Sequence, residues 1–305
     1  KYLCRKNTNV IETVEKEILT LVKEIGYSEI TRLFGTLAGG KRLRAKLVLE
    51  IAGSNAAAPR LGAIIELIHA ASLLHDDVID DATLRRGAPS VNATEDSKTA
   101  IMLGDALYSK AYSTLVSFDE TVAKTVADAV TALSVGELMD VRMSETFNAD
   151  ADAYMDMLYL KTAALIEASA KAAALMMGKD AEAYALYGKN LGISFQIIDD
   201  ILDIVSDEAT LGKPALHDYE EGKCTLPYIY LSEALEGEER ERLLSYHREK
   251  LSAENAAWIK AKMKEHKSVE RSYALAQELS DKAIAAVAGD ERLVGIIESM
   301  MKRSF

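Results

Sequence analysis

The sequence is poor in the residues that interrupt helices. Its 305 residues include four prolines, at positions 59, 89, 214 and 227. The long stretches between them carry apolar residues at helical spacing with abundant Ala, Leu, Glu and Lys, and residues 95–205 contain no proline. We therefore expect an all-α protein. A single domain over residues 1–305 is the simplest interpretation, because single-core folds reach this length.

Cysteines and long apolar runs are also scarce. Cys4 and Cys224 form neither a CxxC pair nor the spacing of a secreted disulfide framework, which favours a reducing, cytoplasmic setting. No secretory signal is recognised at the start of the chain. Glu66 and Lys171 interrupt the most apolar stretches, so we expect no membrane span and at most peripheral membrane contact.

Positive charge is in deficit. The chain has 36 Lys and Arg against 48 Asp and Glu, a formal net charge of -12. This balance argues against a nucleic-acid partner, because binding to a phosphate backbone is driven by Lys and Arg side chains that neutralise phosphates and release counterions. A phosphorylated substrate is still compatible with it if a divalent metal bridges the two anions.

A cluster of aspartates ends the apolar helix expected from Leu61 to about Asp81. Asp76 and Asp80 are one helical turn apart and share a face, while Asp77 lies about 100° round the axis. Carboxylate oxygens suit Mg²⁺, which usually takes one or two protein carboxylates and completes its shell with phosphates and water. Taken alone, one DDxxD motif is also compatible with a solvated acidic face.

A second cluster, Asp199, Asp200 and Asp203, ends another apolar helix, GISFQIIDDILDIV. The repetition makes coincidence much less plausible. Two such helix ends could face one another across a cavity and hold several metal ions around one diphosphate.

Basic residues accompany the first acidic cluster. Arg85 and Arg86 follow it within a Gly- and Pro-containing loop, and Lys41 and Arg44 follow a Gly39-Gly40 turn. Guanidinium groups bind phosphates bidentately, and glycines let the backbone approach an anion closely. Each basic pair read alone is equally compatible with a surface salt bridge.

Five segments together carry a family resemblance: GGKRLRAKL, ELIHAASLLHDDVIDDATLRRG, LKTA, FQIIDDILD and GKPALHDYEEGKCTLP. They resemble the ordered signature regions of the trans-isoprenyl diphosphate synthases, and in particular a long-chain member such as an octaprenyl diphosphate synthase. The resemblance implies the isoprenoid synthase fold, an antiparallel helix bundle around a deep central cavity, in a homodimer that uses Mg²⁺. The chain departs from the family at Ala45, where proline is frequent, and at Leu216, where glycine is frequent.

The resemblance also assigns residues. Metal ions and the allylic diphosphate are expected at Asp76, Asp77, Asp80, Asp199, Asp200 and Asp203, with Arg85, Lys161, Lys213 and Lys223 around the same diphosphate. Isopentenyl diphosphate is expected at Lys41, Arg44, His69 and Arg86. The side-chain oxygens of Thr162 and Gln196 are expected to stabilise the allylic cation electrostatically.

Product length depends on the residues one turn before Asp76, which point toward the growing tail. They are Ala71 and Ser72, where a bulky aromatic would block elongation, so we expect a long-chain product of about C30 to C45 made from a primer such as farnesyl or geranylgeranyl diphosphate. Small residues serve close helix packing equally well, which leaves geranylgeranyl or farnesyl diphosphate synthase as alternatives. Met102, Tyr108, Tyr112 and Met139 are candidate floor residues for the cavity.

Two other functions compete. A class I terpene cyclase has one such Asp-rich motif but lacks the basic site, and a non-catalytic subunit of a heteromeric synthase would be expected to have lost aspartates. A catalytic subunit of a heteromer stays open, because this chain retains both acidic clusters.

Overall fold

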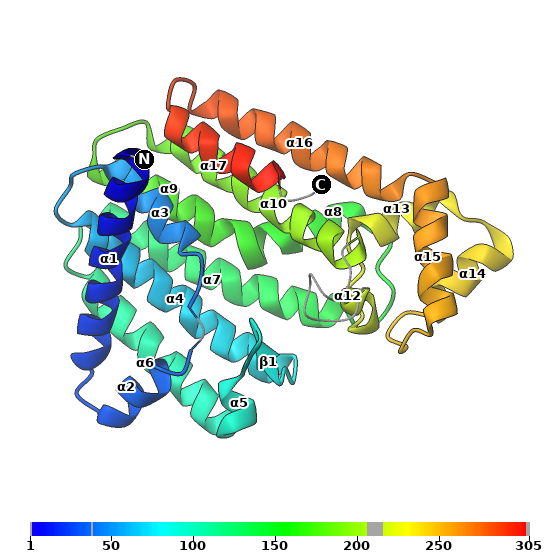
Figure 1. Cartoon of the computed structure of the whole chain (residues 1–305), viewed down its shortest axis with the longest axis horizontal. Coiled ribbons are helices and arrows are strands. Elements are labelled where there is room, and N and C mark those ends of the chain that lie inside the picture. The colour runs from blue at the N-terminus through cyan, green and yellow to red at the C-terminus, as the bar shows by residue number, and fades with distance from the viewer. Residues whose placement is uncertain (1, 38, 206–215, 303–305) are drawn as a thin grey trace. The chain divides into compact units, whose positions relative to one another are not determined.

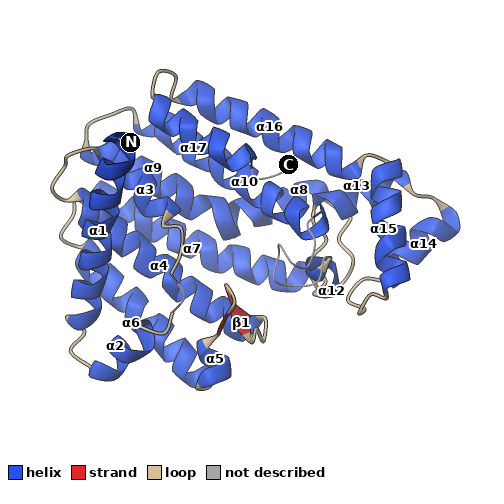
Figure 2. Cartoon of the chain, viewed as in Figure 1, coloured by secondary structure: helices blue, strands red, loops and turns tan. Residues whose placement is uncertain are grey.

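The computed structural model describes residues 2–37, 39–205 and 216–302, with side chains from residue 11 onward. Nearly all the regular structure in these residues is helical, with one two-stranded hairpin (Figure 2). The expected all-α class is therefore confirmed. None of the helices in the described ranges is both long enough and apolar enough to cross a bilayer.

The chain divides into two compact units. The first combines Lys1–Thr131 with Leu165–Ala185, and the second combines Ala132–Ala164 with Leu186–Phe305. Three helices, α7, α9 and α10, contribute residues to both units. A single domain over residues 1–305 stays a prediction.

Helix α4 is the central element of the first unit. It packs against α1, α3 and α6 and is buried almost continuously from Ala58 to Ile68, which explains its apolar composition. Pro59 lies in its first turn, where the missing N–H has no helical partner to lose, so α4 begins three residues before the expected Leu61. The elements of this unit are α1 (Tyr2–Lys23), α2 (Ser28–Phe34), α3 (Leu43–Ala52), α4 (Ala58–Ile79), β1 (Leu84–Arg85), β2 (Ala88–Pro89), α5 (Val91–Thr94), α6 (Ser97–Leu115), the start of α7 (Glu120–Met143) and most of α9 (Ala164–Met176) (Figure 1).

The second unit has its own apolar core. Ile197 and Ile201 of α10 pack there with the stacked rings of Tyr219 and Tyr228, whose centroids are 4.2 Å apart. Its elements are the end of α7, α8 (Ala151–Leu158), the π-helix η1 (Tyr159–Ala163), most of α10 (Ala181–Val205), α12 (His217–Glu220), α13 (Leu226–Ala234), α14 (Gly237–Ser245), α15 (Ala253–Glu265), α16 (Ser268–Ala286) and α17 (Glu291–Met301).

Candidate functional site

The first acidic cluster lies at the end of α4, and its aspartates have different environments. Asp77 is buried, Asp76 is partly exposed, and Asp80, the C-cap residue, is exposed. Asp76 and Asp80, one turn apart, are therefore the carboxylates of this cluster that reach solvent.

Asp77 is held by Arg85 within the first unit. The Arg85 Nε donates to Asp77 Oδ1 over 2.7 Å, and the Arg85 Nη2 lies 2.5 Å from the same oxygen. Burial raises the pKa of Asp77, the bond from Arg85 opposes this effect, and the nearby Asp80 adds to it. Asn92 secures the turn by donating to the carbonyl oxygens of Asp77 and Ala82. Asp77 is therefore less available to a metal ion than Asp76 and Asp80.

The segment after the cluster forms a β-hairpin rather than the expected irregular loop. Leu84 pairs with Pro89 and Arg85 with Ala88. The two turn residues, Arg86 and Gly87, have φ values of 55° and 76°. Positive φ at both positions is typical of the tight turn that matches the twist of two antiparallel strands, and glycine adopts it readily.

Arg86 lies over the glycine turn that precedes α3. A Cβ atom built on Gly40 would lie 2.7 Å from Arg86 Nη1 and 3.3 Å from Arg86 Cζ. Glycine at position 40 therefore makes room for the Arg86 guanidinium.

A cluster of cations surrounds His69. Burial lowers the pKa of His69 well below its usual 6.5, and the charges of Arg44 and Arg86 lower it further. Burial also lowers the pKa of Arg44, against the attraction of Glu66. The Nε of Arg44 is buried without a hydrogen-bond partner among the described residues. Three of the four residues expected to bind isopentenyl diphosphate thus share one electropositive site, and the fourth, Lys41, is exposed on the preceding turn.

The carboxylate of Glu66 stabilises the start of α3. Its Oε1 accepts from the backbone N–H of Ala45 over 3.1 Å, and its Oε2 lies 3.4 Å from Arg42 Nη1. Arg42 also donates to Glu15 over 2.7 Å. Because proline has no N–H, the departure to alanine at position 45 supplies the donor for buried Glu66.

The residues expected to set product length lie on α4. Ala71 is fully buried, and a Cβ built on Gly104 of α6 would lie 3.3 Å from the Ala71 carbonyl oxygen. Ser72 donates to the carbonyl oxygen of His69. Ala71 therefore serves close packing of α4 against α6, whatever its part in product length. Met102, one candidate floor residue, is 62% exposed.

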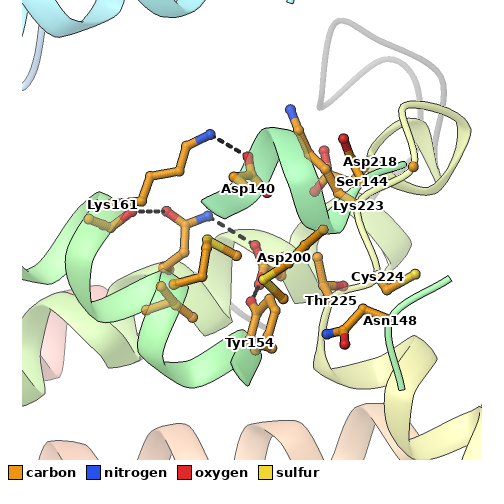
Figure 3. Close-up of a pocket in the computed structure, with 16 residues that line it drawn as sticks. Asp140, Ser144, Asn148, Tyr154, Lys161, Asp200, Asp218, Lys223, Cys224 and Thr225 are labelled. Carbon is orange, nitrogen blue, oxygen red and sulfur yellow. Dashed lines mark hydrogen bonds and ion pairs between the residues drawn. The ribbon is translucent and has the colours of Figure 1, made fainter. Parts of the chain in front are cut away.

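A pocket in the second unit brings together five of the expected residues: Lys161, Thr162, Gln196, Asp200 and Lys223 (Figure 3). It encloses about 690 Å³ of empty space, including its opening to solvent. The other lining residues are Asp140, Met143, Ser144, Asn148, Tyr154, Met157, Leu158, Asp218, Gly222, Cys224 and Thr225.

Lys161 and Thr162 are carried by the π-helix η1. Single π-turns are rare and frequent at functional sites, and the sequence carries no pattern that would distinguish this one from ordinary helix. Gly136 of α7 lies against it, since a Cβ there would be 2.3 Å from the Lys161 backbone nitrogen. The glycine therefore permits the close approach that places Lys161 and Thr162.

Two carboxylates of α7 hold the Lys161 ammonium. Its Nζ lies 2.5 Å from Asp140 Oδ2 and 2.9 Å from Glu137 Oε2. Burial lowers the pKa of Lys161, but these two carboxylates outweigh it and raise the pKa overall. Lys161 therefore stays charged. Sequence reasoning missed Asp140 and Glu137, whose only signal was acidic residues one turn apart in GELMD.

Hydrogen bonds link Thr162, Gln196, Asp200 and Tyr154 (Figure 3). Thr162 Oγ1 donates to Gln196 Oε1 over 3.1 Å, and Gln196 Nε2 donates to Asp200 Oδ1 over 2.9 Å. The hydroxyl of Tyr154 donates to Asp200 Oδ2. Burial, followed by the charge of Asp218, raises the pKa of Asp200 to about 8 against the two donated hydrogen bonds. Tyr154 and Asp218 were also missed, because their contacts join separate elements.

The three aspartates of the second cluster differ as well. Asp199 is exposed and Asp200 is buried in the pocket. Asp203 is 3% exposed, and its Oδ2 accepts from the backbone N–H of Asp218 over 3.2 Å. Its carbonyl oxygen accepts from Leu216 N. Asp203 thus anchors the segment that leads to Lys223.

That segment contains the second departure from the family. Leu216 has a φ of 64° and a fully buried side chain. Glycine adopts this left-handed conformation without a steric penalty, whereas burial of the leucine side chain offsets the strain here. Lys223 lies 2.8 Å from Glu221, and its N–H donates to the Asp218 carbonyl. Lys213 lies outside the described residues.

The carboxylates fit a metal that is shared with a substrate. Over the described ranges, no group of three or more His, Cys, Asp or Glu closes around a metal ion. Mg²⁺ commonly takes one or two carboxylates and fills its remaining positions with phosphate oxygens and water. Solvent-accessible Asp76 and Asp80 in the first unit and Asp199 in the second have the donor chemistry that this arrangement requires.

An all-α fold with two Asp-rich helix ends and a buried basic cluster defines a helical enzyme that handles diphosphates. The chain matches the family model for polyprenyl synthetase over residues 28–263, and it belongs to that family. It is therefore a prenyltransferase, as the sequence predicted. Members of the family use a divalent metal in catalysis.

Two curated relatives differ in the products that their names state. The chain is 40% identical over 220 residues to a short chain isoprenyl diphosphate synthase of Methanothermobacter thermautotrophicus, covering 68% of each protein. It is 38% identical over 212 residues to an all-trans-nonaprenyl-diphosphate synthase of Rhodobacter capsulatus, covering 67% of the chain and 65% of the relative.

Solved structures share the fold over nearly the whole chain. An octaprenyl pyrophosphate synthase from Helicobacter pylori superposes with a TM-score of 0.91 at 41% identity, covering 97% of this chain and 98% of the other. A polyprenyl synthase from Caulobacter crescentus CB15, complexed with calcium and isoprenyl diphosphate, has a TM-score of 0.84 at 29% identity, covering 99% and 97%. The isoprenoid synthase fold is thus confirmed.

Proposed function

We propose that the chain is a trans-polyprenyl diphosphate synthase that adds isopentenyl diphosphate units to an allylic diphosphate with Mg²⁺. The observation that carries the proposal is the pair of cations beside His69, Arg44 and Arg86, in which the buried Arg44 Nε lacks a partner among the described residues. A diphosphate supplies the missing acceptors. A terpene cyclase does not need this site, whose basic residues differ in chemistry from the acidic clusters.

Each group of residues has a part in the proposed reaction. Asp76 and Asp80 in the first unit and Asp199 in the second would supply metal ligands, with Asp77, Asp200 and Asp203 supporting them. When bound, Mg²⁺ neutralises charge that develops on the leaving diphosphate. Lys161 and Lys223 in the second unit, together with Lys213, would bind the allylic diphosphate. In the first unit Arg85 orients Asp77.

Isopentenyl diphosphate is held by Lys41, Arg44, His69 and Arg86 as its double bond attacks the allylic cation. His69 stays neutral because of its lowered pKa, so it binds by hydrogen bonding. Thr162 and Gln196 present oxygen to the cation, and the departed diphosphate takes the proton that is lost.

We propose a long-chain product of about C30 to C45, supported by the small residues Ala71 and Ser72 at the level of the growing tail. The octaprenyl and nonaprenyl names of two relatives favour the same product class. A geranylgeranyl or farnesyl product is the second candidate, because Ala71 packs closely against α6 and one relative is a short-chain synthase.

We also propose a homodimer, supported by exposed apolar side chains of Ile101, Met102 and Tyr112 on α6. A cytoplasmic location remains part of the proposal, on the basis of the two cysteines, whose spacing does not match a secreted disulfide framework.

The deciding experiment incubates the purified chain with farnesyl diphosphate, isopentenyl diphosphate and Mg²⁺, then determines the masses of the dephosphorylated products. Prenols of six or more isoprene units are expected. Products that stop at four units would refute the long-chain assignment. No condensation at all would refute a self-sufficient synthase, and a cyclic hydrocarbon would identify a cyclase.

A further inference from the structure

Tyr154 of α8 makes a contact for which neither the acidic motif nor the condensation chemistry accounts. It is 3% exposed, lines the pocket of the second unit, and donates its hydroxyl hydrogen to Asp200 Oδ2. Asp200 Oδ1 accepts from Gln196 Nε2 over 2.9 Å. Both oxygens of one buried carboxylate are therefore occupied by donors from different helices (Figure 3).

The direction of these hydrogen bonds fixes the orientation of the next groups. Because Asp200 Oδ1 accepts from Gln196 Nε2, Gln196 turns its NH₂ group toward Asp200 and its Oε1 away from it. Oε1 then accepts from Thr162 Oγ1 over 3.1 Å. The single hydroxyl hydrogen of Thr162 is used in this bond, so its lone pairs are directed elsewhere, and Thr162 also lines the pocket.

The result is a one-way chain of donors that runs from Thr162 through Gln196 to Asp200 and is closed by Tyr154 from the opposite side. If Tyr154 lost its hydroxyl, Asp200 Oδ2 would be buried without that donor, which is costly. The carboxylate would then be able to rotate, and the Gln196 amide could flip and offer N–H groups to Thr162. Thr162 would in turn be able to point its O–H into the pocket.

We propose that Tyr154 is a positioning residue that, through Asp200, fixes the polarity of Gln196 and Thr162 so that oxygen lone pairs rather than O–H or N–H groups face the allylic cation. The inference rests on the proposed function, because it is the condensation that develops positive charge at this pocket. In this role Tyr154 acts on the cation through Asp200, Gln196 and Thr162.

The test is Tyr154→Phe, which keeps the ring and removes only the hydroxyl. We expect kcat to fall about 10- to 100-fold, the range for a buried acceptor that loses its donor, with the KM for isopentenyl diphosphate unchanged. The matched control is Tyr187→Phe, because Tyr187 is a fully buried tyrosine of the same unit that donates to the Leu293 carbonyl over 2.9 Å. It should lose comparable thermal stability and keep the wild-type kcat.

A second comparison separates action through Gln196 from a general structural effect. In a Gln196→Ala background, Tyr154→Phe should lower kcat by less than about threefold, because residues in one network do not contribute additively. A kcat for Tyr154→Phe equal to that of Tyr187→Phe, or a full effect that persists in the Gln196→Ala background, would overturn the inference.

A binding measurement keeps this inference distinct from the proposed function. Titration calorimetry of inorganic diphosphate with Mg²⁺ should show binding at least about tenfold weaker in Tyr154→Phe than in Tyr187→Phe, because Asp200 is less firmly held. If the wild-type chain bound diphosphate but condensed no isopentenyl diphosphate, the proposed function would fail, and this titration would still decide the role of Tyr154. Equal binding in both variants would count against it.

Discussion

At Gly136 of α7, adding one methyl group should displace the pocket residues of η1 and so reduce activity. In Gly136→Ala, the new Cβ would lie 2.3 Å from the Lys161 nitrogen and 2.7 Å from Leu160 C and Lys161 Cα. Carbon contacts are normal only from about 3.5 Å, so the π-helix would have to move by more than about 1 Å. All three atoms belong to the backbone, and no side-chain rotation can relieve the contact.

The magnitudes follow from this geometry. Replacing glycine by alanine inside a helix gains about 0.5–1 kcal/mol, whereas overpacking costs about 1–3 kcal/mol. A backbone clash belongs at the upper end of that range, so we expect a net loss of about 2 kcal/mol in the free energy of unfolding. A displacement of about 1 Å at Lys161 and Thr162 should lower kcat by about 100-fold.

The assay is condensation of radiolabelled isopentenyl diphosphate with farnesyl diphosphate, alongside urea unfolding. Gly295→Ala is the matched control, because Gly295 lies within α17 and an added Cβ there has no atom within 4 Å. It should raise stability by about 0.5–1 kcal/mol and leave kcat unchanged. Wild-type kcat and stability in Gly136→Ala would refute the claim that the contact of α7 with η1 places Lys161.

Three further perturbations test other parts of the site. Asp76→Ala and Asp199→Ala should each abolish turnover while leaving the circular dichroism of the helices unchanged, and full activity in either would contradict the assigned metal role. Ala71→Phe should shorten the product, as measured by mass analysis, at a cost in stability from overpacking against α6; an unchanged product would remove the tunnel argument. The pKa of His69 is lower in the folded chain than its usual 6.5, so the unfolded chain binds more protons and stability should fall as pH drops below about 6.5. His69→Gln should therefore lose less stability between pH 7.5 and 5.5, and an identical loss would show that His69 does not carry this dependence.

The helices that end in acidic clusters were predictable because local signals agree there. In α4, a largely apolar run, a proline at the start and aspartates at the end all describe one helix, and the structure places that helix at Ala58–Ile79. For α10 the signals were an apolar run and the aspartates at its end, without a proline at the start. The hairpin at Arg86-Gly87 was predicted only as a loop, because short apolar alternation is missing from its strands.

The parts that escaped prediction depend on contacts between distant residues. Nothing in YLKTA distinguishes the π-helix from an ordinary helical turn, because these residue types are also common in α-helices. The π-helix coincides with the close approach of Gly136 of α7, which is distant in sequence. Tyr154 is 46 residues from its partner Asp200. Leu216 was noted as a departure from a frequent glycine, but its left-handed backbone is visible only in the structure.

The second acidic cluster shows how helical geometry divides equal residues into different roles. Asp199 and Asp203 are one turn apart and should share a face, yet Asp199 is exposed whereas Asp203 is buried, because the segment from Leu216 to Asp218 covers the last turn of α10 and donates two N–H groups to Asp203. Asp200, on the adjacent face, is turned into the pocket and held by Tyr154 and Gln196. A carboxylate with solvent access can change partners when a metal and a diphosphate bind. A buried carboxylate that accepts from fixed N–H groups would have to break those hydrogen bonds, which would leave the N–H donors buried without an acceptor. The three aspartates of DDILD therefore have different roles. Asp199 is an exposed metal-ligand candidate, Asp200 is an oriented carboxylate of the pocket, and Asp203 anchors the following segment. The spacing of aspartates predicts only the first of these roles.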